Sequence, residues 1–338
     1  MNYDKLLILT AKNDGAFAKF MINKGFNLEH VWKNDHYSSR KFHILKPLNL
    51  HYLLYGFNKE QIEKYDKIIL NETNQMAEIA KSILLWNKNV KLKVCMWNIV
   101  RDKTRQDIIE LRKMGIDIFS FDERDCEKYG LIYAPLMYPY DIKQRIDDVQ
   151  IEYECYFCAA DKNRLEKLNL LLNSFKENNI SYKCRILKEK HKKYNVTEEL
   201  KSIIFMDKPI MYEEMIKEMQ KSNCIIEILQ EGQSGFTLRV QESLFYDKKL
   251  ITNNQSIKNY DFYNSNNIFI INNNYDKIKE FLKKPYTKID NKIKEKYKLI
   301  YEDNDLVFAR NNGTYVDQRT FMKRYHAFLD KYRIHSIR

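Results

Sequence analysis

One stretch in the second half of the chain, residues 222–254, limits the fold more than any other. Residues 224–229 form an apolar run that is typical of a buried strand, and only Glu227 interrupts it. A polar, glycine-containing loop follows, and apolar residues then recur at helical spacing over residues 236–245. Residues 249–252 return to a strand-like run. Strand, loop, helix and strand predict a βαβ unit in a parallel sheet.

The loop of this unit is predicted to lie at the carboxyl edge of the sheet, where ligands of such sheets bind. Backbone N–H groups of residues 234–236 would be unpaired at the start of the helix and would favour an anion. Gly235 would let a phosphate approach the backbone closely. Arg239 and Glu242 share one helical face, which offers a cation for phosphate and a carboxylate for sugar hydroxyls. The alternative is a solvated ion pair on an ordinary helix, which stabilises it by only about 0.2–0.5 kcal/mol.

The same stretch carries a G-x-T-x-R-x-x-E block, formed by Gly235, Thr237, Arg239 and Glu242 and followed by the sequence KKLIT. This block resembles the donor-binding part of GT-B glycosyltransferases of the bacterial surface-polysaccharide type, and weaker similarity extends over residues 1–285. The resemblance implies transfer of a sugar from a nucleotide-sugar donor to a cell-surface polysaccharide or a lipid-linked precursor, with no cofactor besides the donor. Better-known retaining enzymes carry a second glutamate where this chain has Ser234, so inversion and retention both stay open.

Other donor-binding residues are expected in loops at the same sheet edge. In GT-B enzymes, basic residues after the first strand of the second domain meet the donor diphosphate, and the resemblance gives that role to Arg164 and, less directly, to Lys162 or Lys167. A solvated helix flank is the alternative for these three residues. The expected donor-binding set is Arg164, Tyr212, Gln233, Ser234, Gly235, Thr237, Arg239 and Glu242.

An inverting transfer needs a base in the first domain. Asp14 follows the first predicted strand and is the first candidate, with Glu72 second and His36 third. Each could equally be a capping or surface residue. No D-x-D sequence stands at a strand end, so we expect no metal site and metal-independent catalysis.

Length and alternation of elements predict the domain organisation. The chain has 338 residues, enough for two cores, and strands alternate with helices in each half. We therefore expect an α/β protein with two doubly wound, Rossmann-like domains facing a cleft, as in GT-B enzymes. Residues 1–145 are the predicted acceptor-side domain, 146–298 the donor domain and 299–338 an appended segment. Residues 41–45 are read as a short strand, and residues from 121 onward as the crossing between domains.

Composition narrows the class of protein and of partner. Hydrophobic residues make up 44% and aromatic residues 13% of the chain, which excludes a disordered protein. The net charge of +12 suits an anionic partner, but the cations are spread along the chain, so nucleic acid is not favoured. No apolar stretch approaches the roughly 18–20 residues that span a membrane. We expect a cytoplasmic protein, or one held peripherally at the inner face of a membrane.

The last segment has a different character. Residues 301–338, with His335 and Arg338 as an H-x-x-R box, resemble the catalytic domain of phage-type tyrosine recombinases. The nucleophilic tyrosine of that family follows the box, whereas this sequence stops at Arg338. We therefore expect this segment to be an inactive remnant. Three alternatives stay open: a chance likeness of this segment, a fragment of a DNA recombinase, and a non-catalytic nucleotide or glycan binder.

Overall fold

A computed structural model of the protein describes residues 5–11, 16–33, 37–136, 138, 145–146, 148–189, 192–194 and 200–297. The recombinase-like segment, with His335 and Arg338, lies outside the described residues, and so do Asp14 and His36. The predicted domain boundaries, including the one near residue 299, therefore stay predictions.

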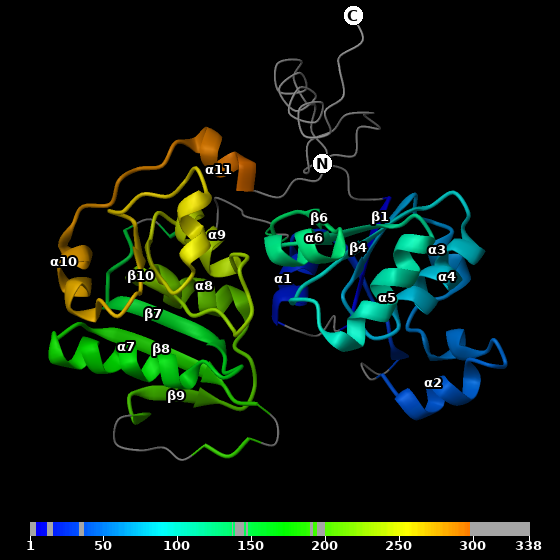
Figure 1. Ribbon diagram of the computed structural model, residues 1–338, viewed down its shortest axis with the longest axis horizontal. Helices are drawn as coiled ribbons and strands as arrows, with labels where there is room; N and C mark the ends of the chain where they lie inside the picture. The colour runs from blue at the N-terminus through cyan, green and yellow to red at the C-terminus, as the bar shows by residue number, and fades with distance from the viewer. Residues whose placement is uncertain are drawn as a thin grey trace, which may run out of the picture. The chain divides into compact units, whose positions relative to one another are not determined.

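The first half of the chain builds one parallel sheet (Figure 1). Its strands are β1 (Leu6–Thr10), β2 (Asn27–His30), β3 (Lys67–Asn71), β4 (Lys91–Cys95), β5 (Asp117–Ser120) and β6 (Ile132–Tyr133). Its helices are α1 (Ala16–Asn23), α2 (Ser39–Leu45), the 3-10 helix η2 (His51–Leu54), α3 (Lys59–Ile62), α4 (Met76–Trp86), α5 (Asp102–Lys113) and α6 (Glu123–Tyr129). Over the described residues the strand order is β2-β1-β3-β4-β5-β6, and every neighbouring pair is parallel.

The second half builds another parallel sheet. Its strands are β7 (Tyr153–Ala160), β8 (Tyr182–Leu187), β9 (Ile203–Met206), β10 (Ser222–Glu227), β11 (Lys249–Thr252) and β12 (Ile268–Ile270). Its helices are α7 (Leu165–Glu177), α8 (Tyr212–Gln220), α9 (Leu238–Phe245), η5 (Gln255–Asn259), η6 (Tyr275–Lys277), α10 (Ile278–Lys283) and α11 (Asn291–Tyr297). The strand order is β12-β11-β10-β7-β8-β9, again parallel throughout the described part.

Both sheets are doubly wound. The strand order reverses between β1 and β3 in the first sheet and between β7 and β10 in the second, so helices cover both faces of each sheet. In the second sheet, α7 and α10 pack on one face through Leu172 and Phe281, while α8 and α9 pack on the other through Ile216 and Val240 (Figure 1). The expectation of two doubly wound α/β domains is confirmed. Parallel strands buried on both faces read as apolar runs, which is why this part of the fold could be predicted.

Aromatic packing joins α1 of the first half to α8 of the second. The ring centroids of Phe17 and Phe20 lie 5.1 and 4.8 Å from that of Tyr212 at the start of α8. Phe20 and Tyr212 belong to the same buried cluster as Tyr138, whose side chain is 0% exposed. These contacts fix one side of the region in which the two halves meet.

Two local predictions are wrong. Residues 41–45 belong to helix α2, whose first turn is capped where Ser38 Oγ accepts a hydrogen bond from Lys41 N. The stretch after Phe121 does not yet cross to the second half, because Asp122 caps α6 and strand β6 joins the first sheet. In both places a side-chain cap starts a short helix, and the weak apolar periodicity did not reveal it. Among the described residues, no helix has the length and apolar character needed to cross a membrane.

Candidate functional site

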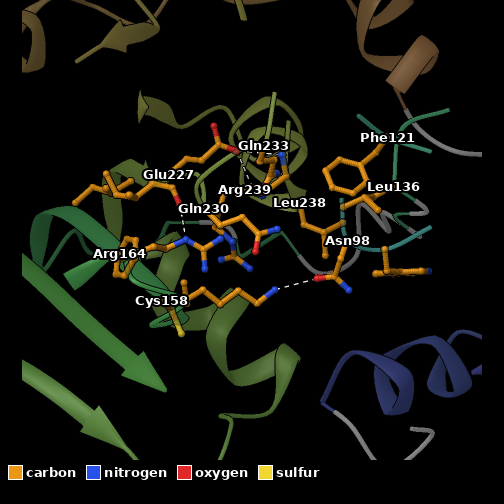
Figure 2. Close-up of a pocket in the computed structure, with 17 residues that line it drawn as sticks. Asn98, Phe121, Leu136, Cys158, Arg164, Glu227, Gln230, Gln233, Leu238 and Arg239 are labelled. Atoms are coloured by element: carbon orange, nitrogen blue, oxygen red, sulfur yellow. Dashed lines mark hydrogen bonds between the residues drawn. The ribbon is translucent and has the colours of Figure 1, made fainter. Parts of the chain in front are cut away.

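A cavity of about 250 Å³ opens at the carboxyl ends of β7 and β10, where the strand order of the second sheet reverses. Doubly wound sheets bind their ligands at this point. The loop after β4, with Trp97 and Asn98, also lines the cavity, together with Phe121 and Leu136 (Figure 2). The cavity is therefore built from both halves of the chain.

Three cationic side chains line this cavity: Lys162, Arg164 and Arg239 (Figure 2). Lys162 lies in the turn between β7 and α7 with a positive φ of 40°, and its Nζ donates to Asn98 Oδ1 at 3.0 Å. Burial lowers the pKa of Lys162, and the neighbouring guanidinium groups of Arg164 and Arg101 lower it further. A like-charged, partly desolvated cluster of this kind gains stability when an anion enters.

Arg164 is the N-cap residue of α7, and the backbone fixes its position. Its Nε donates to Ile228 O at 2.5 Å, and its Nη1 donates to Ala160 O at 2.9 Å. Ala160 ends β7 and Ile228 directly follows β10, so Arg164 bridges the ends of the two strands at the switch point. Burial lowers the pKa of Arg164 from its ordinary value. The side chains of Arg164 and Lys162 thus line the cavity. Lys167, the third basic residue considered, is exposed and does not line it.

Arg239 and Glu242 are not a solvated pair. Arg239 Nη1 lies 2.8 Å from Glu242 Oε2, and the side chains are 16% and 0% exposed. The Tyr212 hydroxyl donates a hydrogen bond to Glu242 Oε1. Burial raises the pKa of Glu242 to about 7, while the charge of Arg239 opposes the rise. The structure brings Arg239 into the cavity and leaves Glu242 and Tyr212 behind it, so these two support Arg239 and do not line the cavity.

The loop before α9 contradicts one expectation directly. The Ser234 and Gly235 amides are not free for a ligand, because they donate to Asp122 Oδ2 at 2.6 and 2.8 Å. Ser234 Oγ also donates to Asp122 Oδ1, at 2.8 Å. The missing side chain of Gly235 makes room for the backbone at Phe121 and not for a phosphate, since a Cβ at this position would lie 2.1 Å from Phe121 O. An internal carboxylate takes the place predicted for the anion.

The other loop residues of the expected donor set lie at the cavity. Gln233 lines it, and its Nε2 donates to Gly235 O at 3.0 Å. Thr237 lines it too and caps α9, where its Oγ1 accepts from Arg239 N at 3.1 Å. Capping of this kind fixes the first turn of α9 and therefore the backbone that carries Arg239.

Glu227 supports that cap, a role that its position in the sequence did not predict. It is 1% exposed, and its Oε1 accepts from Thr237 N at 3.0 Å and from Thr237 Oγ1 at 2.7 Å. Its Oε2 accepts from Thr252 Oγ1 at 2.6 Å. Burial raises the pKa of Glu227, and these hydrogen bonds oppose the rise. A lone glutamate inside an apolar strand was the available signal, because a buried carboxylate needs several donors.

Glu72, the second candidate base, lies at the end of β3 and does not line the cavity. One of its oxygens, Oε2, accepts from Trp97 N at 3.1 Å and from Asn98 N at 2.7 Å. Asn98 Nδ2 donates to the same oxygen at 3.1 Å. This geometry positions the loop that holds Lys162, a task for which sequence spacing gave no signal. Asp14 and His36 cannot be placed, since both lie outside the described residues.

Among the described residues, no group of three histidine, cysteine, aspartate or glutamate side chains is arranged to hold a metal ion. The charged groups at the cavity are mainly cationic, and its one lining carboxylate, that of Glu227, is held by two threonines. The cavity can therefore accept an anion, and its walls offer both apolar and amide surface beside the charges.

Comparison with known proteins adds the fold family. No model of a known protein family matches the sequence, and no curated protein does either. Solved structures do match: Alr3699/HepE from Anabaena in complex with UDP and glucose covers 82% of this chain and 88% of its own, with a TM-score of 0.57 and 9% identity. A glycosyltransferase from Rickettsia africae covers 99% and 100%, with a TM-score of 0.53 and 12% identity. The E. coli trehalose-6-phosphate structure bound with UDP-2-fluoro glucose covers 86% and 93%, with a TM-score of 0.50 and 10% identity.

The chain has the GT-B fold. At these identities the likeness concerns the fold alone, and it agrees with two doubly wound parallel sheets whose strand ends share one cavity. Function has to be argued from the cavity itself.

Proposed function

We propose that this protein is a glycosyltransferase that moves a sugar from a nucleotide-sugar donor to a cell-surface polysaccharide or a lipid-linked precursor. The observation that carries the proposal is the convergence of Lys162, Arg164 and Arg239 on one cavity at the switch point of the second sheet. A donor diphosphate is an anion that such a cluster binds well, because ion pairs strengthen where water is partly excluded. The resemblance of the G-x-T-x-R-x-x-E block implies the same role for Arg239.

The cations give the reaction a physical basis. Transfer breaks the bond between the anomeric carbon and a diphosphate oxygen, and negative charge develops on that oxygen. Groups already held in place stabilise this charge without reorganising, and Arg164, bonded to two carbonyls, and Lys162, bonded to Asn98, are held in this way. The acceptor hydroxyl forms the new bond and gives its proton to a base. We propose that transfer needs no metal ion and that Asp14 is the base.

Binding of UDP is the first test, since two solved proteins of this fold carry UDP or a UDP-sugar in the descriptions of their structures. We expect UDP to raise the unfolding temperature, because a ligand at 100 times its Kd adds about 2.7 kcal/mol of stability. GDP and dTDP serve as further probes. Titration calorimetry then compares Lys162→Gln with Lys167→Gln, a matched lysine outside the cavity.

The expected result is a loss of UDP affinity of about tenfold for Lys162→Gln and no change for Lys167→Gln. Equal UDP affinities of the two variants would show that the diphosphate does not bind beside Lys162 in this cavity. A non-catalytic nucleotide or glycan binder is the second candidate, because the cavity needs no base in order to bind a donor. It would bind the same ligands but release no nucleotide from any nucleotide sugar with any glycan or lipid-linked acceptor.

We include peripheral association with a membrane in the proposal, since a lipid-linked acceptor would be presented there. We propose no role in DNA recombination, because the cations behind the net charge of +12 are spread along the chain and form no nucleic-acid patch in the sequence. A covalent adduct between the protein and DNA carrying a recombination site would contradict this.

A further inference from the structure

A second surface of the first domain is apolar and lies outside the cavity. Of the thirteen large apolar side chains that are exposed among the described residues, five fall within residues 44–53. We call these five the apolar patch, and they are Ile44 (59% exposed), Leu48 (63%), Leu50 (36%), Tyr52 (40%) and Leu53 (48%). Single exposed leucines are ordinary, but a run of this density marks a surface that meets an apolar partner.

The backbone holds these side chains outward. Helix α2 ends at Leu45, and Leu50 N and Leu48 N both donate to Leu45 O, at 3.0 and 3.2 Å. Asn49 adopts a left-handed conformation with φ 55°, and its amide donates to Lys46 O at 3.0 Å. The chain therefore turns back through a bonded loop and does not collapse onto the core.

Ring contacts attach the segment to the domain. Phe42 is 0% exposed and packs against Trp32 and His51, with ring centroids 6.0 and 5.5 Å apart. The apolar side of α2 that faces the domain is thus already satisfied. Figure 1 shows α2 set apart from the helices α3, α4 and α5 of the same domain. The apolar patch therefore lies on a segment that Phe42 already anchors, and of its members Tyr52 also contacts the domain, with its ring centroid 6.2 Å from that of Trp86 on α4.

The segment that carries the patch has formal charges of one sign. Arg40, Lys41 and Lys46 lie on the same segment, and residues 39–54 contain no aspartate or glutamate. Arg40 and Lys41 are exposed, while Lys46 Nζ lies 3.2 Å from Glu78 Oε1 on α4. Apolar side chains interleaved with cations on a short helix and loop suit an interface between acyl chains and anionic headgroups.

We propose that the apolar patch and its three cations form a docking surface for an anionic lipid membrane. Leu48 and Leu53 enter the acyl boundary, while Arg40 and Lys41 contact the headgroups. This assigns residues to the peripheral association in the proposed function, and it stands without sugar transfer because vesicle binding is measured without donor or acceptor. Charge favours an anionic membrane over a protein partner, because residues 39–54 carry cations and no carboxylate.

Flotation of the full chain with vesicles tests the proposal. One set of vesicles is phosphatidylcholine alone, and the other contains phosphatidylglycerol as well. We expect binding to the anionic vesicles that weakens as salt is added, and little binding to the neutral ones. The double variant Leu48→Ser/Leu53→Ser should lose about a hundredfold in partitioning, since each leucine that enters the acyl region contributes about tenfold. Arg40→Gln/Lys41→Gln should lose roughly fivefold per cation.

The matched control is Leu170→Ser. Leu170 is 54% exposed but lies on α7 of the other domain, so its vesicle binding should equal that of the unchanged protein. Retained stabilisation by UDP in every variant separates loss of docking from loss of the donor site.

Three results would overturn the proposal. They are equal binding to neutral and anionic vesicles, unchanged partitioning of Leu48→Ser/Leu53→Ser, and a concentration-dependent oligomer that this double variant abolishes. The last result would make the apolar patch an interface between copies of the chain.

Discussion

The Asp122 carboxylate accepts a hydrogen bond from the Ser234 amide at 2.6 Å and so joins two loops that lie 112 positions apart in sequence. Asp122 is 1% exposed and caps α6 of the first half, while Ser234 precedes α9 of the second. The contact ties the loop before α9 to the end of β5. Because α9 carries Arg239, the relation also bears on where that cation lies in the cavity.

Replacing Asp122 should lower the free energy of unfolding strongly. In Asp122→Ala, the Ser234 amide, its hydroxyl and the Gly235 amide all lose their acceptor. Buried donors left without partners cost on the order of 2–5 kcal/mol together, and Asp122→Asn should cost less because one oxygen remains. Thermal unfolding measures the effect. Asp117→Asn, an exposed site on β5, is the control, and equal stability of Asp122→Ala and Asp117→Asn would show that the loop contact contributes little.

Gly235→Ala tests the close approach of the same two loops. A Cβ at this position would lie 2.1 Å from Phe121 O and 2.9 Å from Asp122 Cα, which are both backbone atoms. The loops would have to separate, at an expected cost on the order of 2–4 kcal/mol in the free energy of unfolding. Gly25→Ala is a useful comparison, because nothing lies within 4 Å there and only the positive φ of 85° opposes the change. That variant should lose about 1 kcal/mol. A smaller loss at Gly235 than at Gly25 would contradict the packing argument.

We expect Arg239 and Glu242 to contribute very differently to the affinity for UDP. Arg239 lines the cavity, so Arg239→Gln is expected to weaken UDP binding by roughly ten- to a hundred-fold. Glu242 lies behind it with no exposed surface, so Glu242→Gln should change the affinity by no more than about threefold. Calorimetric titration of both variants decides. A large loss in Glu242→Gln alone would mean that Glu242 reaches the ligand after all, as its place in the sequence block suggested.

Glu242 should also make stability depend on pH. Burial raises its pKa from 4.5 to about 7 in the folded protein. The folded state therefore binds this proton more tightly than the unfolded state. The stabilisation is complete below about pH 4.5 and is lost as pH rises through 7, by an amount on the order of 3 kcal/mol. Glu242→Gln cannot titrate, so the difference in unfolding temperature between variant and parent should grow in favour of the variant from pH 5 to 8. A constant difference over that range would refute the assignment.

Residues 299–338 are predicted to be dispensable for donor binding. Their sequence resembles another family, and the described part of the chain, which ends at Tyr297, already supplies the cations of the cavity. A chain ending at Lys298 should bind UDP with the affinity of the full chain, measured by the same titration. Loss of binding in a truncated chain that still unfolds cooperatively would assign this segment to the enzyme.

The sequence by itself determined the two parallel sheets and the position of the loop before α9. Apolar runs such as residues 224–229, followed by a polar loop and a helical pattern, are local, so they survive in any arrangement of the domains. The same local reasoning placed Arg164 after the first strand of the second sheet and Arg239 on the first turn of α9. All of this follows from periodicity and from the sequence block.

Tertiary structure alone decided which of these groups reach the cavity. Asp122 fills the amide site at Ser234, and Glu72 holds the loop that carries Asn98, and neither pairing has a sequence signal because the partners are distant in the chain. Arg239 lines the cavity and Glu242 is buried behind it, although both share one helical face. A hydrogen bond or a loss of solvent depends on what packs from elsewhere, so the sequence named the candidates and only the packing of the two halves fixed their roles.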